Sequence, residues 1–376
     1  KESHMDKIGK YQIIKKLGEG ATSVVWLGHD PFAERDVAIK VVASSVFSEG
    51  ERGKIARNLF VTEASLAGKL VHPHIVQIYD AVADADPSYI VMEYVAGGTL
   101  EPYCTPDRLL PMVDLVEMIF KCTRALDFAY RLGVIHRDLK PANILRAGSS
   151  GSDVKISDFG AALSASSDQT AVAGIGSPAY MSPQQVKDHP LNHQSDIFSL
   201  GVVMYQLLAG QLPFQGSNNI SIVYQIANVE PPPPSALRKG IPPAVDAIVM
   251  RAMKKSLEAR YPTWDAFSFD LAETFRNEHL EEARERIADT EKFNTLRGLA
   301  FFRDFNDVQL WELLGFSDWQ RVKPGTVLMH EGQPGDNFCI LAAGEVKVTK
   351  NAKLLNVLSA GECFGEMAYL NEAAGT

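Results

Sequence analysis

The stretch that most constrains the fold of this chain is residues 134–145. Two short apolar runs, Val134-Ile135 and Ile144-Leu145, predict buried strands that hold a polar loop between them. Within eight positions this loop carries an imidazole, a guanidinium, a carboxylate, an ammonium and an amide. Because a solvated surface loop can be equally polar, the flanking sequence must decide whether these groups form a reactive site.

The composition narrows the class of protein. A chain of 376 residues predicts two or three domains, and 46% hydrophobic residues allow each a proper core. The net charge of −9 argues against a nucleic-acid partner, which would require a basic face. No run of 18 apolar residues occurs, so no membrane span is predicted.

The N-terminal residues and the cysteines indicate the cellular compartment of the protein. Residues 1–5 resemble the remnant of a purification tag, and no secretory signal follows them. The four cysteines are widely spaced and form no CxxC pair, which favours reduced thiols over zinc or disulfides. We therefore expect a cytoplasmic protein.

Two elements upstream of the polar loop suit phosphate binding. Gly18 and Gly20 lie in a turn between two predicted strands, where glycines let backbone N–H groups approach phosphate oxygens. Lys40 follows on a third strand. On its own, this lysine could simply be a residue on the solvent-exposed face of that strand. Helical spacing over residues 55–70 places Glu63 as the candidate acidic partner of Lys40, and Pro73 is expected to end this helix.

The order of these motifs resembles that of protein kinases. His136-Arg137-Asp138 followed by Asn143 is similar to the kinase catalytic loop, and Asp158-Phe-Gly, 20 residues after Asp138, to the magnesium-binding element. Lys140 matches the serine/threonine kinase pattern rather than that of tyrosine kinases. Overall the chain resembles the bacterial, eukaryotic-like serine/threonine kinases.

This resemblance implies an α+β, two-lobed kinase fold over residues 6–278. The N-lobe, residues 6–95, is expected to hold a five-stranded sheet, and the C-lobe, residues 96–278, to be mainly helical. The apolar stretch 111–132 predicts a buried scaffold helix in the C-lobe.

The family mechanism assigns roles to the loop residues. Asp138 would accept the proton of a substrate hydroxyl, and Lys140 would neutralise the transferring γ-phosphate of ATP. Asn143 and Asp158 would hold Mg²⁺, with Mn²⁺ as an alternative. Protein substrates and ATP are the implied partners.

The resemblance also implies a nucleotide site in which Lys40, held by Glu63, orients the α- and β-phosphates. Ser23 replaces the third glycine of the family pattern, and its small hydroxyl can still cover phosphates. Met92 would line the back of the nucleotide pocket, while backbone groups of Glu93 and Val95 would form hydrogen bonds with the edge of adenine. The implied ATP-binding set is Leu17, Gly18, Gly20, Ser23, Val25, Ala38, Lys40, Met92, Glu93 and Val95.

The resemblance further predicts control of the site. Arg137 beside Asp138 is typical of kinases activated by a phosphate on the activation loop, and Thr170 is the favoured phosphosite. Ser177 is expected to face the substrate hydroxyl, and Asp196 to anchor the catalytic loop.

A few positions are expected to be structural. Phe159 and Gly160 complete the Asp-Phe-Gly turn. Gln184 stands where the family has a glutamate that pairs with a buried arginine, here Arg260, so we expect a stability cost rather than lost chemistry.

Three function classes remain in competition. An active serine/threonine kinase requires Lys40, Glu63, Asp138, Asn143 and Asp158, and all are present. A pseudokinase scaffold usually lacks at least one of them. A nucleotide-responsive binding module is the third reading, and it rests on the C-terminal region alone.

The predicted secondary structure changes in the C-terminal region, from long helices to short strands. Residues 279–300 predict a helical linker, and residues 301–376 read as short strands with glycine turns, including one at 322–328, which indicates a partial β-barrel or jelly roll. This order resembles a cyclic-nucleotide-binding domain, with cyclic AMP or cyclic GMP as the effector. Its phosphate-binding cassette would use Gly365, Glu366 and Ala368.

That cassette lacks the arginine that neutralises the cyclic phosphate in the family, because the chain ends at Gly375-Thr376. The sequence leaves open a shortened chain, a longer natural protein or a degenerate domain, and favours the first. A half-built barrel would leave an unpaired strand edge, which makes a homodimer a candidate assembly.

Overall fold

The computed structural model describes residues 6–20, 22–48, 50–148, 151–161, 163–164, 178–276, 287–330 and 337–365. The chain divides into two compact units, Lys1–Arg284 and Glu285–Thr376, each considered by itself. The expected positions Thr170, Ser177, Glu366 and Ala368 lie outside the described residues.

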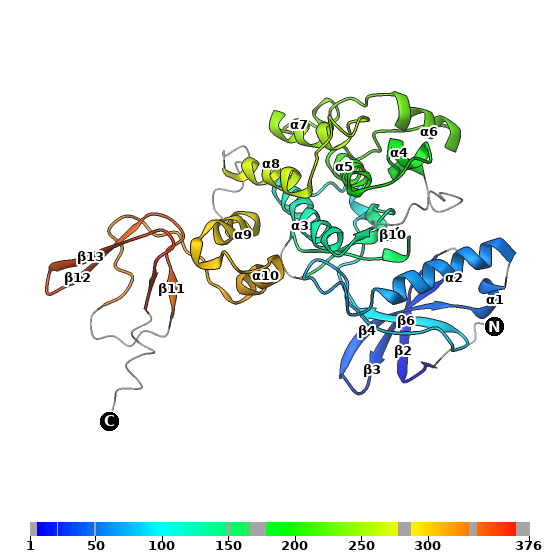
Figure 1. Cartoon of the computed structure of the whole chain (residues 1–376), viewed down its shortest axis with the longest axis horizontal. Helices are drawn as coiled ribbons and strands as arrows, with labels where there is room; N and C mark the ends of the chain where they lie inside the picture. Colours follow the sequence, from blue (N-terminus) through cyan, green and yellow to red (C-terminus); the bar gives the residue numbers. More distant parts are fainter. Residues whose placement is uncertain are drawn as a thin grey trace. The chain divides into compact units, whose positions relative to one another are not determined.

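The first unit begins with an antiparallel sheet whose strand order is β1-β2-β3-β4-β6-β5 (Figure 1). The five expected strands are present, and a two-residue strand, β1, adds a sixth at the edge beside β2. The sheet buries Val37, Ile39 and Val91 completely, which gives the N-lobe its core. The strands are β1 (Lys7–Ile8), β2 (Tyr11–Glu19), β3 (Val24–Asp30), β4 (Arg35–Val42), β5 (Ile78–Val82) and β6 (Ser88–Glu93).

Two helices, α1 (Ser44–Phe47) and α2 (Gly50–Ser65), accompany this sheet. The expected helix at 55–70 is therefore displaced toward the N-terminus. It stops before Gly68, which adopts φ +72°, a left-handed conformation that ends a helix, so Pro73 is not the residue that terminates it.

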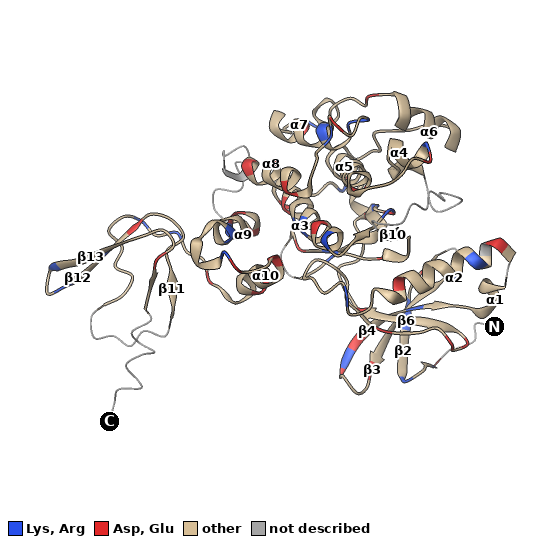
Figure 2. Cartoon of the chain, viewed as in Figure 1, with Lys and Arg blue, Asp and Glu red and all other residues tan. Residues whose placement is uncertain are grey.

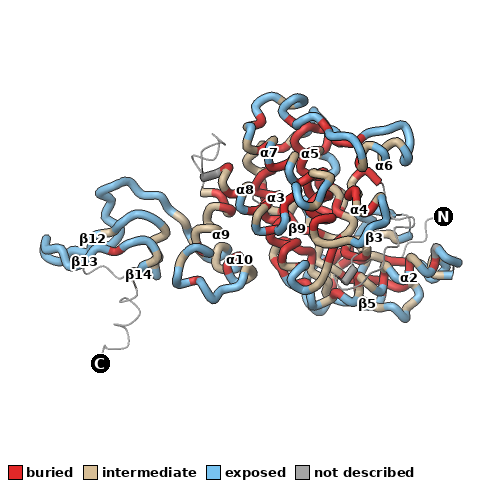
Figure 3. Tube along the Cα trace, turned by 45° about the horizontal axis from the view of Figure 1, so that its top comes forward, coloured by how far each residue is buried: buried red, intermediate tan, exposed pale blue. Residues whose placement is uncertain are grey.

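The C-lobe is built around α3 (Met112–Arg131), which agrees with the predicted scaffold helix to one residue at either end. Leu115, Met118, Ile119 and Cys122 recur at helical spacing on α3, and all are buried. Much of α3 is coloured as buried in Figure 3. The other C-lobe helices are α4 (Pro183–Val186), α5 (His193–Ala209), α6 (Asn219–Asn228), α7 (Pro243–Ala252) and α8 (Trp264–Arg276).

The polar loop sits between short strands, as its flanks predict. β7 (Val134–Ile135) pairs with β10 (Leu163–Ser164), and β8 (Ile144–Arg146) pairs with β9 (Val154–Ile156). Pro141 to Asn143 form a single 3₁₀ turn that closes the loop. This unit has the two-lobed fold expected of a protein kinase.

The second unit opens with two helices, α9 (Asp289–Gly298) and α10 (Asp307–Phe316). Its strands form two two-stranded sheets, β11–β14 and β12–β13. Residues 279–286 of the helical linker expected at 279–300 lie outside the described residues. The strands are β11 (Cys339–Ile340), β12 (Glu345–Lys350), β13 (Lys353–Ser359) and β14 (Cys363–Phe364).

Two expectations for this unit were wrong. The segment 322–328 forms no strand, and Val327 in it is 62% exposed. Helix α10 was not anticipated, although Asn306 and Gln309 form a capping box that starts it.

Positive and negative residues are interspersed over the described parts of both units, with no long basic stripe (Figure 2).

Candidate active site

Asp196 of helix α5 holds the backbone at the start of the catalytic loop. Its carboxylate accepts the N–H of His136 at 2.7 Å and the N–H of Arg137 at 2.9 Å. Arg137 adopts φ +71°, a left-handed conformation that is unfavourable for a side chain other than glycine. The buried carboxylate therefore stabilises a strained backbone immediately before Asp138.

A second residue holds the other side of Arg137, and the sequence reasoning missed it. Gln185 of α4 donates from Nε2 to the carbonyl oxygen of Arg137 at 3.0 Å. Ser182 and Gln185 also form a capping box at the start of α4. The spacing of serine and glutamine was a readable signal for the cap, but it did not indicate the contact with the loop.

The loop brings Asp138, Lys140 and Asn143 together. Lys140 Nζ lies 2.8 Å from Asp138 Oδ2. Asn143 Nδ2 donates to the carbonyl oxygen of Asp138 at 2.8 Å and to its Oδ2 at 3.2 Å. The carboxylate of Asp138 is thus oriented by a cation and an amide from its own loop, and its side chain keeps 23% exposure, within reach of a substrate hydroxyl.

Lys40 joins the two lobes. Its Nζ lies 2.7 Å from Glu63 Oε2 on α2 and 3.1 Å from Asp158 Oδ1 after β9. Burial alone would lower the pKa of Lys40, but the two carboxylates raise it above its ordinary value. The lysine is therefore held as a cation where phosphate groups would meet it.

Asp158 lies in a strained turn beside the loop. It adopts φ +61°, and the ring of the following Phe159 packs on His136 with centroids 4.5 Å apart. A Cβ on Gly160 would approach Asp158 Oδ1 to 3.3 Å, so a larger residue there would require the carboxylate to shift. Burial works to raise the pKa of Asp158, yet Lys40 holds it below its ordinary value, so the carboxylate is ionised.

Asn143 and Asp158 are suited to holding a divalent cation together. Ser157, which precedes Asp158, donates its N–H to the carbonyl oxygen of Asn143 at 2.8 Å, so the two residues are neighbours. Their oxygen donors suit Mg²⁺, which usually takes one or two protein ligands and completes its shell with water and substrate phosphates. Accordingly, no cluster of three or more acidic, histidine or cysteine ligands occurs in the part of the chain that the structure describes.

The expected nucleotide positions lie on adjacent strands. Val25 pairs with Gly18 on one side and with Lys40 on the other, and Ala38 pairs with Met92. In the glycine turn, the N–H of Gly20 bonds the carbonyl oxygen of Ser23 at 2.8 Å. The expected nucleotide set also includes Leu17, which is 39% exposed on β2, and Val95, which follows β6.

Glu93, for which only a backbone role is expected, also makes two side-chain contacts. Glu93 Oε1 lies 3.0 Å from Lys155 Nζ on β9, and Oε2 accepts the N–H of Gln77 at 3.3 Å. Glu93 also donates its own N–H to Gln77 at 2.8 Å. The segment that would bond adenine is thereby joined to the strand that leads to Asp158.

Arg260 is fully buried and bonded mainly to backbone oxygens. It donates to Lys254 O at 2.8 Å, to Gln194 O at 2.7 Å and to Lys255 O at 3.1 Å, and to Gln184 Oε1 at 3.0 Å. Burial lowers the pKa of Arg260 to about 10. The expected amide contact from Gln184 is present.

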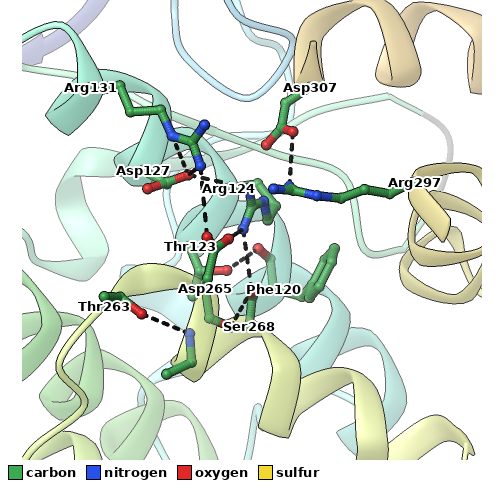
Figure 4. A network of polar contacts seen from close by, with 11 residues as sticks. Phe120, Thr123, Arg124, Asp127, Arg131, Thr263, Asp265, Ser268, Arg297 and Asp307 are labelled. Carbon is green, nitrogen blue, oxygen red and sulfur yellow. Dashed lines mark hydrogen bonds and ion pairs between the residues drawn. The ribbon is translucent and has the colours of Figure 1, made fainter. Parts of the chain in front are cut away.

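A polar network ties α3 to α8 behind the loop (Figure 4). Arg124 Nη1 bonds Asp265 Oδ1 at 2.6 Å and Ser268 Oγ at 3.3 Å, while Nη2 bonds Asp127 at 3.2 Å. Arg131 Nη2 meets the same Asp127 carboxylate at 2.8 Å. These bonds fix the scaffold helix that leads into the catalytic loop.

The arrangement of two lobes, the lysine bridge and the oriented carboxylate accords with the comparison with known families. Residues 11–266 match the protein kinase domain. The chain belongs to the protein kinase family. Residues 319–376 of this kinase match the cyclic nucleotide-binding domain.

Bacterial serine/threonine-protein kinases are among the relatives of this kinase. PknB of Mycobacterium leprae is 38% identical over 275 residues, which cover 70% of this chain and 42% of the relative. PknB of Mycobacterium tuberculosis is 35% identical over 304 residues, and PrkC of Bacillus subtilis is 34% identical over 286. The matches span 47% and 43% of these two relatives, so the kinase covers less than half of each.

Among the described residues, no helix combines the length and the apolar character that crossing a bilayer requires.

Proposed function

We propose that this chain is a serine/threonine protein kinase that transfers the γ-phosphate of ATP to protein hydroxyls. The observation that carries the proposal is the bridge from Lys40 to Glu63 and Asp158, at 2.7 and 3.1 Å, formed beside the Asp138 loop. Phosphoryl transfer needs positioning and charge compensation more than covalent catalysis, and this bridge supplies both. Lys140 follows the pattern of serine/threonine kinases.

The roles follow from the contacts. Asp138 accepts the proton of the serine or threonine hydroxyl while the hydroxyl oxygen bonds the γ-phosphorus. The bond between the γ-phosphorus and the bridging oxygen of the β-phosphate breaks at the same time. Lys140, 2.8 Å from Asp138, offsets the charge on the transferring group. Lys40 orients the α- and β-phosphates. Asn143 and Asp158 would hold Mg²⁺, which when bound supplies further charge neutralisation on the phosphates.

Transfer of labelled phosphate from ATP-Mg²⁺ tests this function. The chain should phosphorylate serine- and threonine-containing protein substrates but not tyrosine-only ones, and an Asp138→Asn variant should lose the activity. Wild type and variant with equal activity would refute the assignment, and transfer to tyrosine alone would refute the substrate class.

We further propose that autophosphorylation of Thr170 activates the kinase. Arg137 supports this: its Nε is buried and, among the described residues, has no hydrogen-bond partner, and burial lowers the pKa of its guanidinium. A phosphate would supply the missing acceptor and the counter-charge.

Mass spectrometry of the active enzyme should find phosphate on Thr170, and a Lys40→Met variant should lack it. A Thr170→Ala variant should be less active, with an unchanged melting temperature. An unmodified Thr170 in fully active enzyme would refute the switch.

We also propose that cyclic AMP or cyclic GMP binds the second unit and regulates the kinase. The family match at 319–376 supports this proposal, as does Gly365, which adopts φ +90° and leaves no room for a Cβ beside Asn337. Calorimetric titration with each nucleotide and transfer rates with and without it test the idea. Failure of both nucleotides to bind would end it.

A cytoplasmic location is proposed on separate grounds. All four cysteines are free thiols, as is usual in a reducing compartment. Cell fractionation with an antibody against the chain would test it, and recovery in the secreted fraction would overturn it.

A further inference from the structure

We infer that Gln185 is a positioning residue for the catalytic carboxylate. Its side-chain amide fixes the peptide group between Arg137 and Asp138 and thereby sets the direction of the Asp138 carboxylate. The inference rests on the proposed kinase function and adds a residue from outside the catalytic loop to its machinery.

The amide of Gln185 is held at both ends. The residue is only 4% exposed, Nε2 donates to Arg137 O at 3.0 Å, and Oε1 accepts the N–H of Ser182 at 2.9 Å. The backbone N–H of Gln185 in turn donates to Ser182 Oγ at 3.2 Å. A buried amide whose donor and acceptor are both hydrogen-bonded has little freedom to rotate. The side chain of Gln185 therefore makes a fixed contact between α4 and the loop.

The strained backbone explains why such an arm is needed. Arg137 has φ +71°, so the peptide groups before and after it meet at an angle that most side chains avoid. Asp196 bonds the N–H groups of His136 and Arg137, which fixes the group before the strained residue. Gln185 bonds the carbonyl oxygen after it, on the peptide group that carries Asp138.

Only one other bond holds that second peptide group among the described residues: the N–H of Asp138 donates to His136 Nδ1 at 3.2 Å. Rotation of this group about the Arg137 bonds would swing the Asp138 side chain relative to Lys140 and to the incoming hydroxyl. Misplacement of a reacting group by about 1 Å can reduce the rate a hundredfold. The contact from Gln185 therefore bears on the chemical step.

The alternative is that Gln185 serves only to cap α4. The oxygen and the nitrogen of its amide distinguish the two roles. The oxygen accepts the capping bond from Ser182, and the nitrogen donates to the carbonyl oxygen of Arg137. Gln185→Glu keeps the size and the capping oxygen but replaces the donor. An ionised carboxylate cannot donate to Arg137 O, whereas a protonated one can.

The experiment measures kcat, the KM for ATP and the melting temperature of the full chain between pH 6 and pH 8. At pH 8 we expect kcat of Gln185→Glu to fall about tenfold, the loss of one well-oriented hydrogen bond. The KM for ATP should stay unchanged, since Lys40, Glu63 and Asp158 make no contact with Gln185. The deficit relative to wild type should shrink toward pH 6, as the new carboxyl gains a proton.

Ser182→Ala is the matched control, because it removes the other half of the cap and leaves the bond to Arg137. It should lower the melting temperature without changing kcat. A wild-type kcat in Gln185→Glu, a deficit independent of pH, or an equal loss of kcat in Ser182→Ala would overturn the inference. Asp138→Asn in the same series separates the two claims: wild type no faster than this variant would refute the kinase function itself.

Discussion

Arg260 donates from Nη2 to Gln184 Oε1 over 3.0 Å, and no carboxylate lies within ion-pair distance of this guanidinium in the described part of the chain. The guanidinium is fully buried, so its desolvation is compensated by neutral oxygens and by the ring of Phe198, whose centroid lies 5.0 Å from Cζ. The family pattern has glutamate at the position of Gln184, and the first prediction restores it.

Gln184→Glu should raise the melting temperature by roughly 2–4 °C, the shift that about 1 kcal/mol gives in a domain of this size. The new carboxylate would face Arg260, so its pKa should lie below the ordinary glutamate value. The gain should therefore be present at neutral pH and disappear as the pH falls through that lowered pKa.

Calorimetry at a series of pH values from 7 down to 3 measures this effect, with Gln184→Met as the control that removes the amide contact without adding charge. The control should melt below wild type. A Glu variant that melts no higher than wild type at pH 7 would show that the lost bond from Gln184 to Lys255 O, at 3.1 Å, outweighs the charge.

The second prediction concerns Glu63, which is 3% exposed and 2.7 Å from Lys40. Glu63→Gln should lower kcat/KM about ten- to a hundredfold, because Lys40 loses the charge that holds it toward the phosphates. Phosphate-transfer kinetics give the measurement. Glu51→Gln, on the same helix but paired with Lys54 at the surface, should behave as wild type. Similar losses in both variants would contradict the assigned role.

The third prediction concerns pH and Lys255, whose Nζ lies 4.0 Å from the ring centroid of Phe214. Burial lowers the pKa of Lys255 to about 8, from 10.5 for an exposed lysine. Between these values the unfolded chain binds more protons than the folded one, so the contribution of Lys255 to stability rises with pH across that window.

Lys255→Met should therefore melt above wild type at pH 7, and the difference should shrink toward pH 10. Thermal unfolding at a series of pH values measures it. Lys254→Met, which removes a neighbouring lysine 3.8 Å from Glu230, controls for a general effect of losing a positive charge. A difference that stays constant from pH 7 to pH 10 would contradict the prediction.

The fourth prediction concerns the pair of Glu93 and Lys155, at 3.0 Å and largely buried. Lys155→Met should raise the KM for ATP roughly two- to fivefold, the range expected for one partly screened ion pair. The reason is that the segment expected to bond adenine loses its link to the strand before Asp158. Lys155→Arg, which keeps the charge, should retain a near-normal KM; an unchanged KM in the Met variant would count against the link.

The loop residues of the site could be predicted because they are neighbours in sequence. Asp138, Lys140 and Asn143 lie within six positions, and a single 3₁₀ turn brings their side chains together. Lys40 and Asp158 come from distant strands, and their meeting was expected from the order of the motifs rather than from any local pattern.

The remaining contacts depend on packing that no local pattern encodes. Gln185 reaches a carbonyl 48 positions away, and its spacing from Ser182 indicates only a helix cap, not this contact. In the second unit, the segment 322–328 was expected to be one of several short strands between glycine turns, but no strand pairs with it among the described residues. There the pattern predicted the wrong element.

The residues that hold Arg137 all follow the catalytic loop in the chain. Asp196 and Gln185 bond its backbone from α5 and α4, 59 and 48 positions downstream. Because a ribosome releases the chain from its N-terminus, His136 to Asn143 emerge before either anchor. A nascent chain that stops short of residue 196 thus carries the reactive side chains without the two contacts that hold the backbone of Arg137.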